Sequence, residues 1–210
     1  MKKVKNTKYI TIVDQGDLEQ VLIGSLLGDG CFTKVSGAVK NSRFSLAHSS
    51  KQKEYFLFKY NIFKKYGLEG KVSENTISNE RYKEGYTKEI RFKSKSHPIF
   101  TKFRKVYNNG KKRVILDVIN NINVLGLAIW YMDDGNINNY SCDFNVQSFT
   151  LEEREVLQKL LQDKFNIKVT ITNNTLYVLK ENFPYFVSII KPFIIKEMEY
   201  KLKPYKMGSV

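Results

Sequence analysis

The sequence predicts an α+β protein built from two similar halves, each with a leading apolar helix, antiparallel strands and amphipathic helices. The first observation is a repeat, because VLIGSLLGDG (21–30) and LGLAIWYMDDG (125–135) are both apolar and both end in Asp-Gly. The second is that the segments 44–72 and 144–169 both follow the pattern of strand, helix cap, amphipathic helix and strand. Asp29 and Asp134 therefore occupy equivalent points of two fused half-domains.

The amphipathic helices have recognisable beginnings. Thr150 and Glu153 have the spacing of a capping box, and Ser50 takes the cap position in the first half. Pro98 and Pro184 each mark the passage from a strand into a later helix. The helix of the second half has its apolar side chains on one face, at Leu157, Leu160, Leu161 and Phe165.

The strands alternate between apolar and polar side chains. In TKEIRFK (87–93) Ile90 and Phe92 share one face, while the opposite face carries Glu89, Arg91 and Lys93. KVTIT (168–172) alternates in the same way. One face then packs on helices and the other is polar, which suits a surface that reads base edges but also an ordinary solvated sheet.

The charge balance favours the nucleic-acid interpretation over a merely solvated basic surface. Lysine and arginine number 35 against 21 acidic residues, giving a net charge of +14, which indicates a polyanionic partner. Residues 1–105 carry 22 basic and 10 acidic side chains, whereas residues 106–210 carry 13 and 11. We therefore expect the first half to make more of the phosphate contacts.

Several classes of protein are disfavoured. No run of about 18 apolar residues is present to span a bilayer, and the basic N-terminus lacks the apolar segment of a signal peptide. Cys31 and Cys142 are too few for a disulfide framework or a zinc site. We expect an intracellular protein without a membrane partner, in a bacterial or phage-infected cytoplasm or in an organelle.

The two Asp-Gly pairs call for an explanation, because a carboxylate at a helix C-terminus meets the negative end of the helix dipole. A bound Mg²⁺ would compensate, since it prefers hard oxygen ligands. The alternative is that each Asp-Gly only terminates a helix, with glycine in the left-handed conformation. Two copies in a basic repeat protein favour the metal site over this alternative.

The first apolar helix also has the small residues that a close helix contact needs. Gly24 and Gly28 lie one turn apart on one face, with Ser25 beside them. A second helix that approached there would bring Asp29 and Asp134 together from opposite halves.

LIGSLLGDG (22–30) and LAIWYMDDG (127–135) resemble the two LAGLIDADG motifs of homing endonucleases, whose eighth position is the catalytic acid. This position corresponds to Asp29 and Asp134. AIWYMDDG, NVQSFTLEE and EMEYKLKP further resemble the subgroup of the mitochondrial omega-intron endonuclease, from about residue 18 to about residue 204. The second motif has Ile129 and Trp130 at positions of Gly and Leu in the idealised signature, so the helix contact there should have a different shape.

The resemblance implies a monomer of two αββαββα-like halves. Its motif helices would pack at the centre, and its two antiparallel sheets would form a saddle in the DNA major groove. We expect a basic extension over residues 1–17, a first half over 18–112 and a second half over 113–210.

The resemblance also implies the site residues. Asp29 and Asp134 would share two or three Mg²⁺ ions, with Gly28 contributing through its backbone and Asp133 through packing or support of the ligands. The other catalytic residues would be Lys112 or its neighbour Lys111, Lys201 and Gln147. The counterpart of Gln147 is Ala47 or His48, and His48 is expected to be an exposed polar residue rather than a general base. Charge and strand alternation suggest DNA contacts at Lys34, Arg43, Lys71, Arg91, Lys93 and Lys168.

The expected function is a Mg²⁺-dependent endonuclease that hydrolyses one phosphodiester in each strand of a long asymmetric DNA target, as part of an intron- or intein-associated mobile element. One alternative is an RNA-binding maturase that helps its host intron fold. Another is a DNA-binding regulator without cleavage, against which the intact pair of aspartates and both lysines argue.

Overall fold

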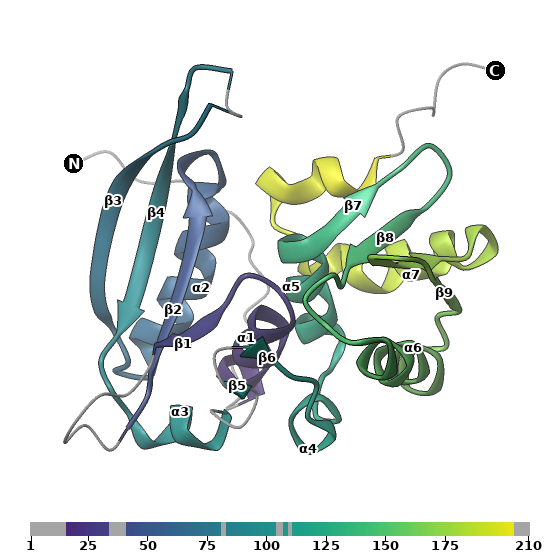
Figure 1. The fold of residues 1–210 in the computed structure, drawn as a ribbon, viewed down its shortest axis with the longest axis horizontal. Helices are drawn as coiled ribbons and strands as arrows, with labels where there is room; N and C mark the ends of the chain where they lie inside the picture. The colour runs from purple at the N-terminus through teal and green to yellow at the C-terminus, as the bar shows by residue number, and fades with distance from the viewer. Residues whose placement is uncertain (1–15, 34–40, 81–82, 104–106, 109–110, 204–210) are drawn as a thin grey trace.

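The computed structural model describes residues 16–33, 41–80, 83–103, 107–108 and 111–203 (Figure 1). Each half follows the predicted order αββαββα. The first half contains α1 (Gly16–Leu27), β1 (Cys31–Thr33), β2 (Arg43–Ser49), α2 (Lys53–Lys65), β3 (Gly70–Ser78), β4 (Tyr86–Ser94) and α3 (Pro98–Phe103). The second half contains α5 (Val124–Asp134), β7 (Gly135–Ile137), β8 (Cys142–Asn145), α6 (Leu151–Phe165), β9 (Val169–Ile171), β10 (Thr175–Val178) and α7 (Phe183–Ile190).

Short elements connect and follow the two halves. Between them lie the two-stranded β5 (Tyr107–Asn108) and β6 (Lys111–Lys112) and the helix α4 (Leu116–Ile119). The 3₁₀ segments are η1 (Ser50–Gln52), η3 (Lys180–Asn182), η4 (Lys191–Phe193) and η5 (Lys196–Leu202). The predicted boundary between residues 112 and 113 falls directly after β6. None of the described helices has the combined length and apolarity needed to cross a bilayer.

The two main sheets have the same topology. Their strand orders are β1-β2-β4-β3 and β7-β8-β10-β9, and every pairing is antiparallel. In Figure 1 the sheets stand on opposite sides of the molecule, with α1 and α5 between them. This arrangement agrees with the predicted pair of fused half-domains.

The α1–α5 contact is as close as the glycines predict. A Cβ on Gly24 would lie 2.4 Å from the carbonyl oxygen of Gly126 and 2.8 Å from Cβ of Ile129. A Cβ on Gly28 would lie 2.3 Å from Cβ of Asp133. The bulk of Ile129 is thus accommodated by the missing side chain of Gly24, while Trp130 turns away onto Phe144, with ring centroids 4.4 Å apart.

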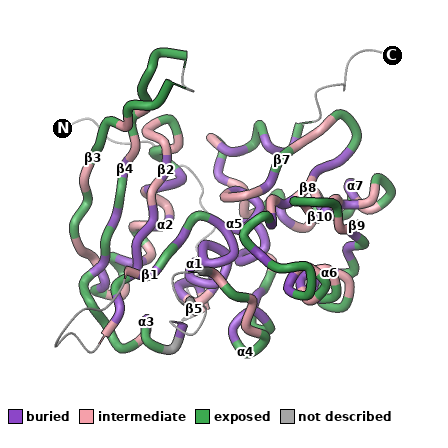
Figure 2. The backbone as a smooth tube through the Cα atoms, in the orientation of Figure 1, coloured by how far each residue is buried: buried purple, intermediate pink, exposed green. Residues whose placement is uncertain are grey.

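The core lies along α1 and α5, whose tubes are mostly in the buried colour in Figure 2, and includes alternate residues of the sheet strands. Phe44 of β2 stacks on Phe63 of α2 with ring centroids 5.2 Å apart. In the second half Tyr131 of α5 packs edge-on against Phe186 of α7 at 5.0 Å. The predicted apolar face of α6 is confirmed as buried, at Leu157, Leu160, Leu161 and Phe165.

One helix cap agrees with the sequence and one does not. The capping box of α6 is present, because Thr150 Oγ1 accepts from the N–H of Glu153 and Glu153 Oε2 accepts from the N–H of Thr150. In the first half the cap is Ser49, not Ser50, since Ser49 Oγ accepts from the N–H of Lys51. A 3₁₀ turn precedes α2 there and moves the start of the helical segment by one residue.

The glycines of the Asp-Gly pairs have a different role from left-handed helix termination. Gly135 has φ −77° and ψ 143°, and Gly30 is not among the described residues with positive φ. Instead, a Cβ on Gly135 would lie 2.2 Å from the ring of Tyr131, and one on Gly30 would lie 2.7 Å from the ring of Phe44. Glycine is required at both positions because the chain passes close to an aromatic side chain.

Candidate active site

The two motif helices end at a pair of carboxylates. Asp29 lies in the turn that follows α1, and Asp134 is the last residue of α5. The side chain of Asp29 keeps 45% of its surface exposed, so an ion or substrate can reach it. Asp134 is half-buried. The packing of Gly24 and Gly28 against α5 is what brings these two chain positions together.

Both carboxyl groups hold their protons more tightly than a free aspartic acid. Burial and the neighbouring Asp133 raise the pKa of Asp29 to about 7. The same two causes raise the pKa of Asp134 to about 6. Asp29 and Asp134 together form a pair of hard oxygen donors, and a divalent cation would stabilise the ionised form of both. The residues present therefore fit a site for a divalent cation.

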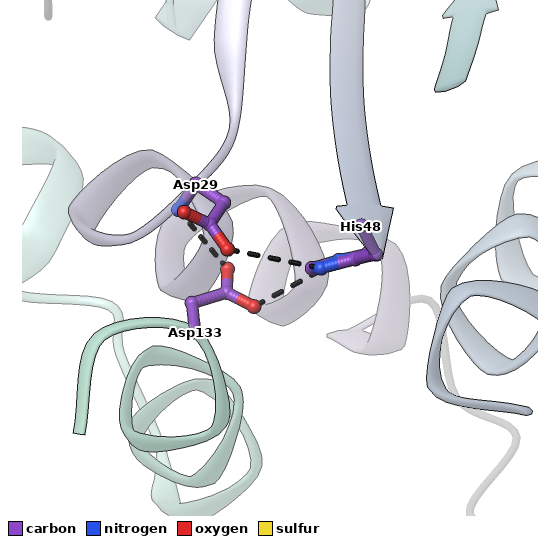
Figure 3. Close-up of side chains that lie close together, drawn as sticks. All are labelled: Asp29, His48 and Asp133. Carbon is purple, nitrogen blue, oxygen red and sulfur yellow. Dashed lines mark hydrogen bonds and ion pairs between the residues drawn. The ribbon is translucent and has the colours of Figure 1, made fainter. Parts of the chain in front are cut away.

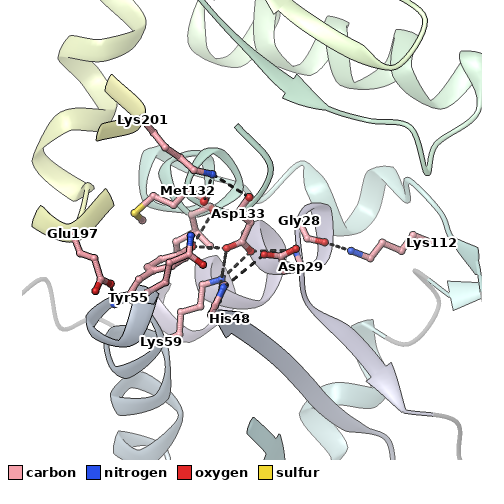
Figure 4. Close-up of polar contacts among 12 residues, drawn as sticks. Gly28, Asp29, His48, Tyr55, Lys59, Lys112, Met132, Asp133, Glu197 and Lys201 are labelled. Atoms are coloured by element: carbon pink, nitrogen blue, oxygen red, sulfur yellow. Dashed lines mark hydrogen bonds and ion pairs between the residues drawn. The ribbon is translucent and has the colours of Figure 1, made fainter. Parts of the chain in front are cut away.

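Two lysines meet the C-terminal ends of the motif helices. The ammonium of Lys112 donates to the carbonyl of Gly28, and that of Lys201 donates to the carbonyls of Met132 and Asp133 at 2.6 and 3.2 Å (Figure 4). The two halves are equivalent in this respect. Each lysine neutralises part of the negative end of a helix dipole, a task that the sequence had suggested for a metal ion alone.

The same geometry bears on the choice between Lys111 and Lys112. The side chain that reaches the end of α1 is that of Lys112. Burial lowers the pKa of both Lys112 and Lys201, opposed by the attraction of the nearby aspartates. Both ammonium groups thus lie close enough to attract the carboxylates. Among the described residues, each is held there by backbone carbonyls and not by a carboxylate oxygen.

Asp133 is the centre of a buried polar cluster between the two halves. Its carboxylate has no exposed surface and accepts from Lys59 Nζ at 2.6 and 2.8 Å. The hydroxyl of Tyr55 donates to it at 2.7 Å, and the backbone N–H of Asp29 donates at 3.3 Å. Burial is the largest influence and opposes ionisation, but the Lys59 ammonium, His48 and the hydrogen bonds from Lys59 and Tyr55 together hold the pKa of Asp133 below its ordinary value. Asp133 is therefore an ionised, internally neutralised support.

His48 is buried, and the expectation of an exposed histidine was wrong. It is 3% exposed, and its Nδ1 lies 3.7 Å from Asp29 Oδ2 while its Nε2 lies 3.9 Å from Asp133 Oδ1 (Figure 3). Burial and the Lys59 ammonium lower the pKa of His48 to about 3, so the imidazole is neutral. The three side chains Asp29, His48 and Asp133 offer ligand atoms within 4.8 Å of one another.

Sequence reasoning missed Lys59 and Tyr55. Both belong to α2, where Tyr55, Phe56, Lys59 and Phe63 are its buried residues. The available signal was the position of Lys59 at three and four residues from Phe56, Tyr55 and Phe63, on the apolar face of the helix. For His48 the signal was strand alternation, since it shares its face with the buried Phe44 and Leu46.

Gln147 has no hydrogen bond to this cluster among the described residues. It is exposed in the turn after β8, and its backbone N–H donates to Asn145 Oδ1 at 3.1 Å. The residue of the first half that lies beside an acid is His48 rather than Ala47. A role of Gln147 near the reacting phosphate remains a prediction.

The first sheet presents most of the predicted DNA contacts on its open face. Arg43, Lys71, Arg91 and Lys93 are all exposed, and strand register places Lys71 directly opposite Lys93. Such a pair of like charges is unfavourable unless a polyanion lies over it. Arg91 also bonds to Glu89, with 2.9 Å between Nε and Oε1.

Two predicted contacts stand apart from that group. Lys34 lies outside the described residues. Lys168 is exposed and lines a shallow pocket together with Gln158 and Gln162 of α6. The open face of the second sheet carries uncharged or acidic side chains in register, among them Asn136 and Asp143. This difference between the sheets matches the uneven charge of the two halves.

Comparisons with known proteins agree with this fold and site. The model of the LAGLIDADG DNA endonuclease family matches residues 19–186. The chain is 30% identical over 200 residues to cytochrome b mRNA maturase bI2 of Debaryomyces hansenii, covering 90% of this chain and 74% of that one. It is also 30% identical to probable intron-encoded endonuclease 1 of Wickerhamomyces canadensis, covering 88% and 83%.

The structure is similar to that of the homing endonuclease I-WcaI bound to its DNA recognition sequence. The TM-score is 0.78 at 26% identity, and the match covers 96% of this chain and 95% of that one. A structure of I-DmoI in complex with its target DNA shares the fold, with a TM-score of 0.55 at 14% identity over 84% of this chain and 96% of that one. The chain belongs to the LAGLIDADG DNA endonuclease family.

Proposed function

We propose that this protein is a Mg²⁺-dependent homing endonuclease that hydrolyses one phosphodiester in each strand of a long, asymmetric double-stranded DNA target. The observation that carries the proposal is the pair Asp29 and Asp134. Two half-domains supply one carboxyl group each, both with raised pKa values, at the ends of helices in close contact. One chain contains both halves, so the working unit is a monomer.

Each residue of the site has a separate chemical role. Asp29 and Asp134 would hold Mg²⁺, which supplies charge neutralisation and Lewis acidity at the scissile phosphates. Lys112 and Lys201 place positive charge next to each acid, where charge develops on the phosphate oxygens. Asp133 keeps its buried contacts and supports the ligands from behind. Gln147, from the turn after β8, is proposed to orient water.

The first sheet is proposed to supply most of the affinity for the DNA backbone. Arg43, Lys71, Arg91 and Lys93 form an exposed basic face there, and Lys34, which lies outside the described residues, is retained as a further contact. Lys168 is retained as the contact of the second half. Because the second sheet presents mainly uncharged groups, the two halves would read unlike half-sites.

Cleavage of a randomised double-stranded DNA library tests this function. Purified protein is incubated with Mg²⁺ or with Ca²⁺, and the cut ends are sequenced. We expect staggered ends at one long site in Mg²⁺ and no cleavage in Ca²⁺. Tight binding without cleavage in Mg²⁺ would contradict the nuclease and leave a DNA-binding regulator.

A second candidate function is that of an RNA-binding maturase. It is favoured by the similarity to cytochrome b mRNA maturase bI2 over 90% of this chain. The same basic face can bind structured RNA through its phosphates. Splicing of the host intron, measured with and without protein, separates the two functions, because a nuclease alone leaves the splicing rate unchanged.

A further inference from the structure

Lys59 is an unusual residue for its place in the fold. Its side chain has no exposed surface, and it comes from α2, which packs on the apolar face of the first sheet, opposite the exposed basic side chains. An isolated buried ammonium costs several kcal/mol, so its partners must be well defined. They are Asp133 from the second half and His48 from the first. Lys59 therefore joins the two halves at the point where the acids meet.

The first connection from Lys59 to Asp29 runs through Asp133. Lys59 Nζ contacts both carboxylate oxygens of Asp133, at 2.6 and 2.8 Å. One of these oxygens, Oδ2, accepts from the backbone N–H of Asp29 at 3.3 Å. Tyr55, one turn before Lys59, fixes the other oxygen at 2.7 Å. The backbone position of Asp29 thus depends on a carboxylate that Lys59 orients.

The second connection runs through His48. Lys59 Nζ lies 3.3 Å from His48 Nε2, and an ammonium has only donors. Nε2 must then be the acceptor, so the proton of the neutral imidazole is on Nδ1. Nδ1 is the atom that faces Asp29 Oδ2 at 3.7 Å. Lys59 in this way selects the tautomer that turns an N–H toward the carboxylate of Asp29.

The second half has no equivalent of this arrangement. The buried residues of α6, the counterpart of α2, are Glu153, Leu157, Leu160, Leu161 and Phe165, and none of them is basic. Glu153 belongs to the capping box and to the contact with Arg113. Among the described residues, the contacts that lead from Lys59 therefore reach Asp29, whereas Asp134 feels the Lys59 ammonium only through its charge.

We propose that Lys59 is a positioning residue for Asp29, acting through Asp133 and through the Nδ1–H tautomer of His48, and that it makes the two half-sites unequal. Lys59 does not touch the substrate. Loss of its ammonium frees both the backbone and the side chain of Asp29, while the carbonyl of Asp133, which precedes Asp134, keeps its hydrogen bond from Lys201. The predicted effect on strand cleavage rests on the proposed nuclease function. The predicted tautomer of His48 does not depend on that function.

The catalytic test compares the two DNA strands. Lys59→Met is matched with Lys64→Met, the same substitution at an exposed position of the same helix. The cleavage rate of each strand is measured on end-labelled duplex carrying the site that the library selects. For Lys59→Met we expect the rate on one strand to fall about 10- to 100-fold more than on the other, the size of effect that misplaced reacting groups produce. Lys64→Met should leave the strand ratio unchanged.

The strand ratio is insensitive to the fraction of folded protein, because unfolding lowers both rates equally. If Lys59→Met does not fold, the double variant Lys59→Met/Asp133→Asn removes both charges of the pair and keeps an acceptor for the N–H of Asp29. An unchanged strand ratio in the folded variant would overturn the proposal.

NMR of protein labelled with ¹⁵N at its histidines tests the tautomer without any DNA cleavage. Long-range ¹H–¹⁵N spectra distinguish the two tautomers of a neutral imidazole, and His48→Gln identifies the signals of His48 against those of His97. We expect Nδ1–H in the wild-type protein and a mixture of tautomers in Lys59→Met. Nε2–H in the wild-type protein would contradict the proposal even if the protein is a nuclease, and the expected spectra would support it even if no DNA is cut.

Discussion

Asp29 and Asp134 occupy equivalent positions in the repeat, but they have different surroundings. Asp29 faces His48 and donates its backbone N–H to Asp133, while Asp134 ends α5 next to the carbonyls that Lys201 holds. Burial raises both pKa values, to about 7 and about 6. When no cation is bound, ionisation of these two acids in the folded protein therefore costs free energy. Such a cost is typical of a site that binds a divalent ion and not of acids that stabilise the fold from the surface.

This cost of ionisation predicts a pH-dependent effect of Asp29→Asn on stability. The folded pKa of about 7 lies above the ordinary 3.8, so the folded state holds the extra proton between these values. The stability of the wild-type protein therefore falls as pH rises through this window. The Asp29→Asn variant does not lose this stability, because asparagine does not titrate. In EDTA, we expect the Tm of the variant relative to wild type to increase from pH 5 to pH 8. A Tm difference that stays constant or shrinks would contradict the raised pKa.

The two acids and the two lysines could be predicted from the sequence, because they lie in or near recognisable motifs. Lys59 could not be predicted, since a lysine among apolar residues normally extends its ammonium to solvent. Its partner Asp133 lies 74 positions away in the other half. Only the packed structure brings the two charges together, and the same is true of the burial of His48.

At the scale of elements, the contact between α1 and α5 decides the geometry of the site. The spacing of the small residues in α1 predicts this contact. The sequence also predicts the alternation of apolar and polar residues in the strands and the capping box of α6. The sequence places the cap of the first half one residue too late, at Ser50 instead of Ser49, because a 3₁₀ turn and an α-helix have similar initiating residues. The proposed boundaries of the two half-domains are consistent with this element order but remain predictions.

The helix contact predicts a large cost for Gly24→Ala. The new Cβ would lie 2.4 Å from the carbonyl oxygen of Gly126, which belongs to the backbone and cannot rotate away. We expect a loss of about 1–3 kcal/mol in the free energy of unfolding, typical of overpacking. Gly16→Ala is the control, because a Cβ there meets nothing within 4 Å. Denaturant titration measures both, and equal stability of the two variants would show that α1 and α5 are not this close.

At the scale of the whole molecule, the two halves share a topology but differ in charge. The first sheet gathers Arg43, Lys71, Arg91 and Lys93 on one open face, whereas the second sheet presents groups such as Asn136 and Asp143. The excess of basic residues in the first half was visible in the composition. Their location on a single face depends on the register between strands far apart in the sequence.

The charge distribution predicts which lysines control the salt dependence of DNA binding. Lys93→Ser should weaken binding and reduce the slope of log K against log salt by about 0.9, the contribution of one phosphate contact. Lys159→Ser is matched to it, because Lys159 is an exposed lysine of α6 that pairs with Asp163. Its slope should equal that of the wild type. Equal slopes for the wild type and both variants would show that Lys93 does not contact the DNA phosphates.

The most direct test of the account uses Asp29→Asn and Asp134→Asn on the selected DNA target. We expect each variant to lose at least about 100-fold of the cleavage rate in Mg²⁺, the scale of removing one group that stabilises the transition state. Binding in Ca²⁺ should stay within about threefold of wild type, because the basic face is unchanged, and EDTA should abolish wild-type cleavage. Normal cleavage of both strands by either variant would contradict the assignment of the two aspartates as the metal-binding centre.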